Sequence, residues 1–116
     1  MLPKQYRLKK RSAFKATYKV KNSSHSGGVT LFAGILKKDK TPTKVGFVVS
    51  KKVHKRAVKR NRLKRLIRES YRTLLKESNL GDSQKYMSLV FVGTEKALGK
   101  TYKEIRTSVK KILEKI

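Results

Sequence analysis

Hydrophobic and polar positions follow two periods along this chain, and these periods divide it into helices and strands. Residues 29–36, 45–50 and 86–92 are short runs rich in branched and aromatic side chains, which are typical of strands. The run over 45–50 is apolar on both faces of such a strand, so we expect it to be central in a sheet. Residues 22–28 are rich in Ser and Gly and predict a loop.

Two short patterns predict helices near the ends of the chain. Ser12 is placed to cap a helix in which Phe14 and Tyr18, four residues apart, share one face. Thr101 and Glu104 have the spacing of a capping box, which predicts the start of the last helix. With a long central helix and one further strand expected somewhere within residues 20–45, the predicted order is α-β-β-β-α-β-α. This is an α+β fold with one mixed sheet packed against helices.

The central helix is predicted over residues 57–76, where apolar residues recur every three or four positions. The apolar row consists of Leu63, Leu66, Ile67, Tyr71, Leu74 and Leu75. A second row, largely opposite the first, consists of Asn61, Lys64, Arg65, Arg68 and Arg72. Like charges at these spacings destabilise a helix in water, and only Glu69 interrupts the basic run. The pattern therefore favours a surface that binds phosphate over a solvated face or a disordered import signal.

The overall charge extends this prediction to the whole chain. Lys and Arg number 32 against 7 Asp and Glu, which gives a net charge of +25 on 116 residues, a length that fits one domain over 1–116. A compact chain with this charge repels itself unless a polyanion neutralises it, and nucleic acid is the expected partner. No run approaches the roughly 20 apolar residues of a membrane span. The absence of cysteine excludes disulfides and thiol catalysis and fits the reducing cytoplasm, where we expect the protein to act.

The sequence contains no group of residues with the types and spacing expected for catalysis by the protein itself. A metal-dependent nuclease needs clustered carboxylates, and a metal-free ribonuclease needs histidines as acid and base. The acids are scattered singly at Asp39, Glu69, Glu77, Asp82, Glu95, Glu104 and Glu114, and His25 and His54 fall in separate segments. Five residues separate Gly93 from Gly99, whereas a phosphate-binding P-loop has four. We expect no catalytic residue, no metal ligand and no nucleotide site.

The sequence from Arg60 to Arg68 resembles the RNR signature of the protein subunit of bacterial ribonuclease P. As in that family, Ser50-Lys51-Lys52 precedes the signature and Ala57 stands three residues before Arg60. The other matching segments are Tyr6-Arg7-Leu8-Lys9, the Phe14 and Tyr18 pair, the strand with Phe32, Val45-Gly46-Phe47-Val48-Val49-Ser50 and the closing strand and helix. One departure lies at 53–56, where many members have Gly-Asn. The resemblance covers nearly the whole chain.

This resemblance implies a subunit of an endonuclease that removes the 5′ leader of precursor tRNA. The family's fold is an α/β sandwich with a left-handed βαβ crossover around the basic helix. The catalyst in the family is an RNA, which requires Mg²⁺, so the implied partners are ribonuclease P RNA and precursor tRNA, with no cofactor held by the protein. The protein is expected to be monomeric apart from the RNA.

The family's functional positions carry over residue by residue. Contacts to the catalytic RNA are implied for Lys59, Arg60, Asn61, Arg62, Lys64, Arg65, Arg68 and Arg72. A leader-binding cleft is implied for Phe14, Tyr18, Phe32, Ser50, Lys51 and Lys52. From the residues alone, Phe14 and Tyr18 are equally well explained as core residues of a short helix. The alternative function is that of a small basic ribosomal protein or a general RNA chaperone, which has the same composition.

Overall fold

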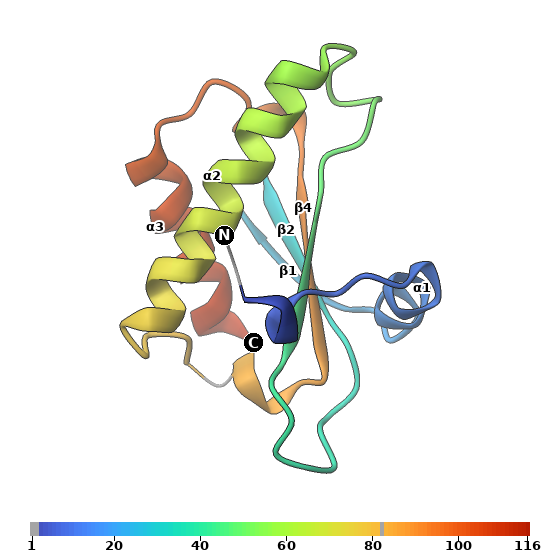
Figure 1. Ribbon diagram of the computed structural model, residues 1–116. Helices are drawn as coiled ribbons and strands as arrows, with labels where there is room; N and C mark the ends of the chain where they lie inside the picture. Colours follow the sequence, from blue (N-terminus) through green and yellow to red (C-terminus); the bar gives the residue numbers. More distant parts are fainter. Residues whose placement is uncertain (1–2, 82) are drawn as a thin grey trace.

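The computed structural model describes residues 3–81 and 83–116 as a four-stranded sheet with helices on both faces (Figure 1). The strands are β1 (Asn22–Ser26), β2 (Val29–Ala33), β3 (Lys44–Val48) and β4 (Ser88–Gly93), in the spatial order β1-β2-β4-β3. The helices are α1 (Arg11–Lys19), α2 (Ala57–Lys76) and α3 (Tyr102–Lys115), with short 3₁₀ turns η1 (Lys4–Tyr6), η2 (Ser83–Lys85) and η3 (Glu95–Ala97). The predicted order of elements and the α+β class are confirmed.

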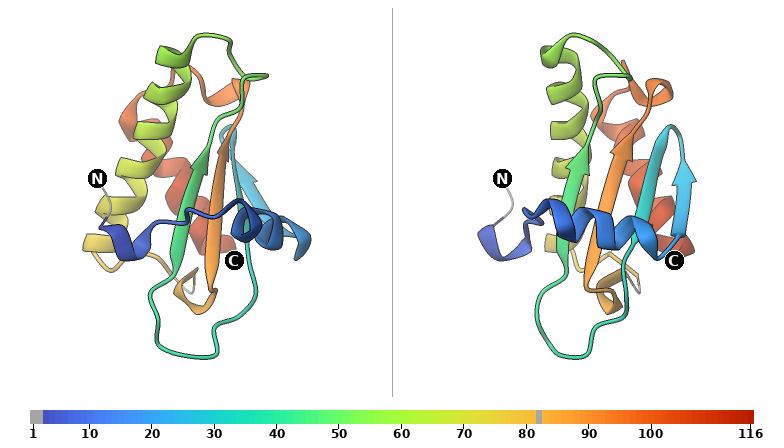
Figure 2. Two further views of the ribbon diagram at one scale, coloured as in Figure 1. Left: turned by 45° about the vertical axis from the view of Figure 1, so that its right-hand side comes forward. Right: turned by 90° about the vertical axis from the view of Figure 1, so that its right-hand side faces the viewer.

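The two faces of the sheet are covered unequally. Helices α2 and α3 pack together on one face, and α1 crosses the other (Figure 2). Strands β3 and β4 are parallel neighbours, whereas the other two pairs are antiparallel. In the right-hand view of Figure 2, β4 lies to the right of β3 and α2 lies behind the sheet, so the β3–α2–β4 crossover is left-handed. Nearly all such crossovers in proteins are right-handed.

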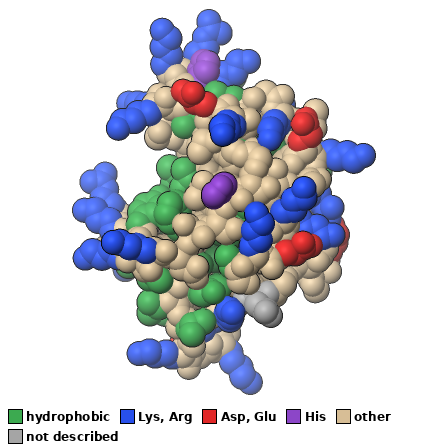
Figure 3. Space-filling model, turned by 180° about the vertical axis from the view of Figure 1, so that it is seen from behind, with side chains coloured by type: hydrophobic (Ala, Val, Ile, Leu, Met, Phe, Trp, Pro, Cys, Tyr) green, Lys and Arg blue, Asp and Glu red, His purple; other side chains and the backbone are tan. Residues whose placement is uncertain are grey.

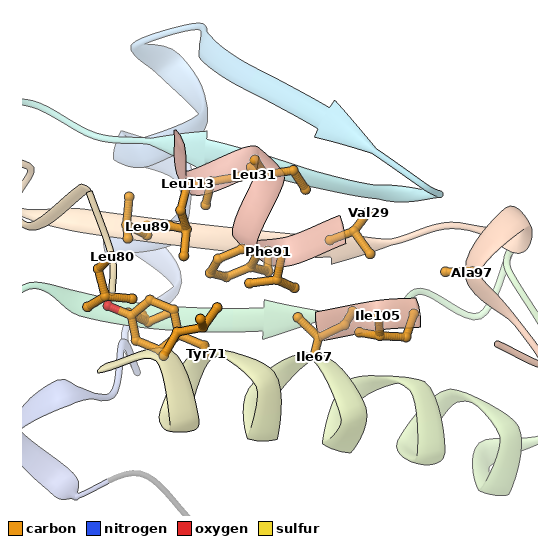
Figure 4. Packing of buried hydrophobic residues seen from close by; sticks show 14 of the residues in the cluster. Val29, Leu31, Ile67, Tyr71, Leu80, Leu89, Phe91, Ala97, Ile105 and Leu113 are labelled. Carbon is orange, nitrogen blue, oxygen red and sulfur yellow. The ribbon is translucent and has the colours of Figure 1, made fainter. Parts of the chain in front are cut away.

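The core forms between α2, α3 and the sheet face toward them. Ile67 and Tyr71 are fully buried and point from α2 toward Phe91 on β4 (Figure 4). The Tyr71 and Phe91 rings meet edge to face with centroids 5.6 Å apart, and Phe47 of β3 stacks on Phe91 at 5.7 Å. Burial raises the pKa of Tyr71 to about 12, and its hydroxyl accepts a hydrogen bond from Gln84 Nε2 at 2.9 Å. One side of α2 is therefore locked into the core.

Residues 22–28 were predicted as a loop, and this prediction is wrong. The segment is strand β1 followed by a two-residue turn at Gly27 and Gly28, with φ of 57° and 88°. Two consecutive positive φ values are typical of a type I′ hairpin turn, which strongly favours Gly. It is the further strand expected somewhere within residues 20–45, and its bounds escaped detection because it lies at the edge of the sheet and carries no large apolar side chain.

The prediction that the strand over 45–50 is central is also wrong, because β3 is the other edge strand. Its two-sided apolar pattern has a different cause. Phe47 faces the core, while the Phe14 ring of α1 lies against Gly46 on the opposite face. The Leu8 N–H donates to the Val45 carbonyl oxygen at 2.9 Å, so the N-terminal segment covers part of this edge.

Of the two predicted helix caps, the one at α3 is confirmed and the one at α1 is wrong. At α3 the capping box is present: the Glu104 N–H donates to Thr101 Oγ1 at 3.3 Å, and the Thr101 N–H donates to Glu104 Oε1 at 3.1 Å. Ser12 does not cap α1, because the helix begins one residue earlier and its N-cap residue is Lys10. Within the described ranges, no helix combines the length and apolar character needed to cross a membrane.

Replacing Ile67 tests how much the burial of one side of α2 contributes to the stability of the fold. We expect Ile67→Ala to lower the free energy of unfolding by about 2–5 kcal/mol, because it leaves a cavity in a closely packed core. Val58→Ala is the control, since Val58 lies on the same helix but is 76% exposed, and its effect should stay within about 0.5 kcal/mol. Urea unfolding followed by circular dichroism measures both. Equal effects of the two substitutions would contradict this packing.

Candidate nucleic-acid interface

The side of α2 that points away from the core carries most of the predicted RNA-contacting residues. We call this set the α2 basic face: Lys59, Asn61, Arg62, Lys64, Arg65, Arg68 and Arg72. Lys59, Asn61, Arg62 and Arg65 are exposed, and the other three are half-buried along their aliphatic stems. Because the opposite side of the same helix is fixed in the core, the positions of these charges are fixed as well.

Arg60 belongs to a different part of the helix surface. It lies three and seven residues before Leu63 and Ile67, so it is on their side of α2 rather than on the α2 basic face. Its Nη1 donates to the carbonyl oxygens of His54 at 2.8 Å and Lys55 at 2.9 Å. The guanidinium thus holds the 53–56 segment against the first turn of α2. The structure gives Arg60 a positioning task that its place in the RNR signature did not indicate.

The charged side chains of the α2 basic face differ in whether they already have a hydrogen-bond partner within the protein. The Arg72 Nε donates to Glu69 Oε1 at 3.0 Å, and this hydrogen bond lowers the pKa of the Glu69 carboxyl. Arg62 Nη2 donates to the Lys100 carbonyl oxygen at 3.2 Å. Within the part of the chain that the structure describes, Arg65 and Arg68 have neither a hydrogen-bond nor an ion-pair partner. Arg65 is exposed whereas Arg68 is half-buried, so the Arg65 guanidinium is the one most available to a ligand.

Helix α1 forms one wall of a second surface on the opposite face of the sheet. The helix is fixed at Thr17, whose Oγ1 lies 2.6 Å from Ser88 Oγ and donates to the Ala13 carbonyl oxygen at 2.8 Å. It is also fixed at Phe14, because a Cβ atom on Gly46 would lie 2.4 Å from the Phe14 ring. Glycine at this position leaves room for the Phe14 ring against the strand.

The aromatic residues beside α1 form a concave surface. Tyr18 and Phe32 meet edge to face with centroids 5.0 Å apart. A cavity of about 360 Å³ next to them is lined by Lys9, Arg11, Phe14, Tyr18 and Val48. We call these five residues and Phe32 the aromatic cleft. In Figure 3 hydrophobic side chains gather in a hollow on this side, between Lys and Arg side chains that project above and below it. Burial raises the pKa of the Tyr18 hydroxyl above its ordinary value.

The structure brings together only part of the predicted leader-binding set. Tyr18 contacts Phe32 and lines one cavity together with Phe14, and because Phe14 and Tyr18 are half-buried they serve packing as well. Ser50, Lys51 and Lys52 are exposed on the segment after β3 and do not line the aromatic cleft. Lys52 instead lines a larger cavity of about 760 Å³ at the β1–β2 turn.

Lys9, Arg11 and Val48 line the aromatic cleft and were not predicted. The basic run over residues 9–11 lies one helical turn before Phe14, and this proximity was the signal that could have identified them. Val48 could not be singled out, because its strand is apolar throughout.

The acidic residues and histidines do not assemble into a reactive site. Across the described ranges, which leave out Asp82, no group of three or more His, Cys, Asp or Glu side chains could hold a metal ion. Glu77 pairs with Arg106 at 2.7 Å, and Glu104 belongs to the α3 capping box. His54 Nδ1 accepts a hydrogen bond from the Arg56 N–H at 3.0 Å. Each of these groups thus has a local structural partner.

Comparisons with known proteins agree with these features. A family model described as Ribonuclease P matches residues 2–116. The ribonuclease P protein component of Clostridium kluyveri is 38% identical over 110 residues, which are 95% of this chain and 93% of the relative. That of Clostridium novyi is 39% identical, over 98% of this chain and 96% of the relative.

Solved structures show the same relationship in three dimensions. The RNase P protein of Staphylococcus aureus superposes with a TM-score of 0.77 at 27% identity, and the match covers 96% of this chain and 94% of that protein. The agreement extends over sequence, fold and nearly the full length of both chains. The chain therefore belongs to the ribonuclease P protein family.

Proposed function

We propose that this protein binds the catalytic RNA of ribonuclease P through the α2 basic face and holds the 5′ leader of precursor tRNA in the aromatic cleft. One observation carries the proposal: the two surfaces lie on opposite sides of one sheet, α2 on one and α1 on the other (Figure 1). The protein can therefore contact two RNA segments at once. A rigid sheet between them fixes the distance from one segment to the other.

The chemistry of the α2 basic face suits a folded RNA. Its arginines present planar forks of N–H donors that match phosphate oxygens, and α2 holds them at fixed spacings. Phosphates also relieve the repulsion between neighbouring cations on the helix. A rigid basic helix of this kind recognises the shape and charge of an RNA rather than its sequence.

The chemistry of the aromatic cleft suits a single strand. Unstacked bases bind to aromatic side chains with little sequence preference, and a basic rim follows the backbone. Tyr18 and Phe32 supply the aromatic faces, while Lys9 and Arg11 supply the charge. A leader is single-stranded and varies in sequence, so this mode of binding is appropriate for it.

Catalysis in this account belongs to the holoenzyme, with the reacting groups and the Mg²⁺ held by the RNA. In support, Glu69, Glu77 and Glu104 each have a partner within the protein. The protein lowers the repulsion between two RNAs and adds contacts to the substrate beyond the tRNA body. It acts in the cytoplasm and is monomeric apart from the RNA, since a second copy would bring another +25 of charge to an interface.

Arg65→Ala tests the contact to the catalytic RNA. Loss of one phosphate contact should weaken binding to ribonuclease P RNA and reduce the slope of log affinity against log salt by roughly 0.7–0.9. Lys111→Ala on α3 is the control, because Lys111 is exposed and its charge should not matter. Filter binding over a salt series measures both. A slope unchanged in Arg65→Ala, or reduced equally in Lys111→Ala, would refute the assignment.

Tyr18→Leu and Phe32→Leu test the aromatic cleft without leaving a large void. We expect each to weaken binding of leader-bearing precursor to the holoenzyme by about 1–3 kcal/mol, since a base loses its stacking partner. Binding of mature tRNA should be unaffected. Val20→Ala, at the exposed end of α1, serves as the control. If precursor and mature tRNA lose affinity equally, these rings belong only to the core.

A further inference from the structure

A groove on the α1 side of the sheet is not used by the RNA contacts proposed above. It has a volume of about 680 Å³ and lies between α1, the N-terminal segment and the connection from β2 to β3, which runs below α1 in the right-hand view of Figure 2. Its walls thus come from segments that are distant in the chain. We call it the apolar groove after six of the side chains that line it: Leu8, Ala13, Ala16, Ile35, Pro42 and Met87.

Two large apolar side chains of the groove are open to solvent. Ile35 is 54% exposed and Met87 is 45% exposed, and Leu36, the next residue in the chain, is 59% exposed. Their exposure does not come from a loose backbone, because the Met87 N–H donates to the Ile35 carbonyl oxygen at 2.8 Å. The Lys44 N–H in turn donates to the Met87 carbonyl oxygen at 3.1 Å. Exposed apolar side chains that cluster in this way are typical of a surface that another molecule covers.

The polar side chains of the groove are largely committed to one another. Thr17 Oγ1 and Ser88 Oγ lie 2.6 Å apart. Asp39 Oδ1 accepts hydrogen bonds from the Thr41 hydroxyl at 2.6 Å and from the Thr41 N–H at 3.1 Å, and both lower the pKa of the Asp39 carboxyl. The groove therefore offers a ligand mainly apolar contact, with one negative charge in its lining.

A second cavity, of about 360 Å³, adjoins the groove and is strongly basic. We call it the basic recess, and it is lined by Lys4, Arg7, Leu8, Lys9, Lys10, Ala13 and Lys44. Leu8, Ala13 and Lys44 line the apolar groove as well, so the two cavities are continuous. Lys38 and Lys40 add exposed positive charge on the β2–β3 connection. Apolar walls next to clustered cations are complementary to a ligand that is both apolar and negatively charged.

A segment of an acidic protein fits these features better than RNA or a second copy of this chain. Unstacked bases bind chiefly to aromatic rings, and none of the described residues that line the apolar groove has one. The Asp39 carboxylate would also repel a phosphate. A second copy would bring another +25 of charge to the interface. Aliphatic walls beside lysines instead suit Leu, Ile or Phe side chains that are flanked by Asp or Glu.

The groove is separate from both surfaces assigned to RNA. On α1, Ala16 and Thr17 line the apolar groove, whereas Tyr18 lines the aromatic cleft, so the helix stands between the two sites. On β3, Lys44 lines the groove and Val48 lines the cleft, and four residues along a strand correspond to about 13 Å. Helix α2 lies on the opposite face of the sheet.

We propose that the apolar groove docks a segment of an acidic protein, which inserts apolar side chains between α1 and the β2–β3 connection and places its carboxylates against the basic recess. Ile35 and Met87 supply the contact area, and Lys44, which lines both cavities, pairs with a carboxylate of the partner. The inference goes beyond the proposed function, because it gives the holoenzyme a protein partner that binds while the RNAs are held elsewhere.

Two peptides of equal charge test the docking site. Both are rich in Glu and labelled with fluorescein; one has Leu and Phe at its centre, and the other has Ser at both positions. We expect the Leu-Phe peptide to bind the holoenzyme more tightly, by about tenfold for each large side chain that becomes buried. Fluorescence anisotropy measures both affinities. Added salt should weaken both peptides and leave the ratio of their affinities unchanged.

Variants of the protein locate the effect. Ile35→Ser and Met87→Ser should each reduce the ratio of the two affinities several-fold, and both variants should remain folded because these side chains are exposed. Val20→Ser is the matched control, since Val20 is an exposed apolar residue at the end of α1 and lines neither cavity. Its ratio should equal that of the wild type. Circular dichroism confirms that all three variants are folded.

Four results would overturn the proposal. The first is equal affinity of the two peptides, and the second is an equal reduction of the ratio in Ile35→Ser and Val20→Ser. The third is weaker binding of ribonuclease P RNA by Ile35→Ser, which would assign the groove to RNA. The fourth is a dimer in sedimentation that Ile35→Ser abolishes, which would assign it to a second copy. Arg65→Ala in the RNA arm reports on the proposed function, so that the two proposals fail separately.

Discussion

The burial of one side of α2 is the constraint on which the rest of this structure depends. Ile67 and Tyr71 hold the helix against Phe91, and the β3–α2–β4 crossover places it across parallel neighbouring strands. With that side fixed, the remaining surface of α2 must face solvent. The positions of its Lys and Arg side chains are then set by core packing rather than by any contact among the charges themselves.

The same arrangement carries a large electrostatic cost. The net charge is +25, and the described residues form two ion pairs, one between neighbours on α2 and one between Glu77 and Arg106. Repulsion therefore opposes folding over much of the surface, and RNA phosphates relieve it. Any ligand that binds the folded chain and not the unfolded one adds to its stability. The RNA binding proposed above would therefore stabilise the folded chain.

Sequence patterns predicted the elements that rest on large apolar side chains. Helix α2 begins and ends where its apolar row indicates, and the Thr101 capping box opens α3. The bounds of strand β1 were missed because it is a polar edge strand, which pairs with β2 through backbone hydrogen bonds that the side-chain pattern does not encode. The edge position of β3 was missed because Leu8 and Phe14, which are distant in the chain, cover this strand. The strand therefore has the two-sided apolar pattern of a central strand. The left-handed crossover came from the family resemblance alone.

The candidate site was predictable to a similar degree. Helical spacing identified the α2 basic face, but it could not show that Arg60 turns back to the carbonyl oxygens of His54 and Lys55. The meeting of Tyr18 with Phe32, and the convergence of Leu8 with Ile35 on the apolar groove, depend on how separate segments pack. Such contacts are properties of the tertiary structure, and no local pattern contains them.

The central claim is that two RNAs bind opposite sides of one rigid sheet, and lysine acetylation read by mass spectrometry tests it most directly. The protein is labelled alone, with ribonuclease P RNA, and with both that RNA and leader-bearing precursor tRNA. The account predicts that Lys59 and Lys64 become protected when the catalytic RNA is added. Lys9 becomes protected only when the precursor follows, and Lys111 on α3 stays reactive throughout. Protection of Lys9 by the catalytic RNA alone, or of Lys111 as strongly as Lys59, would contradict it.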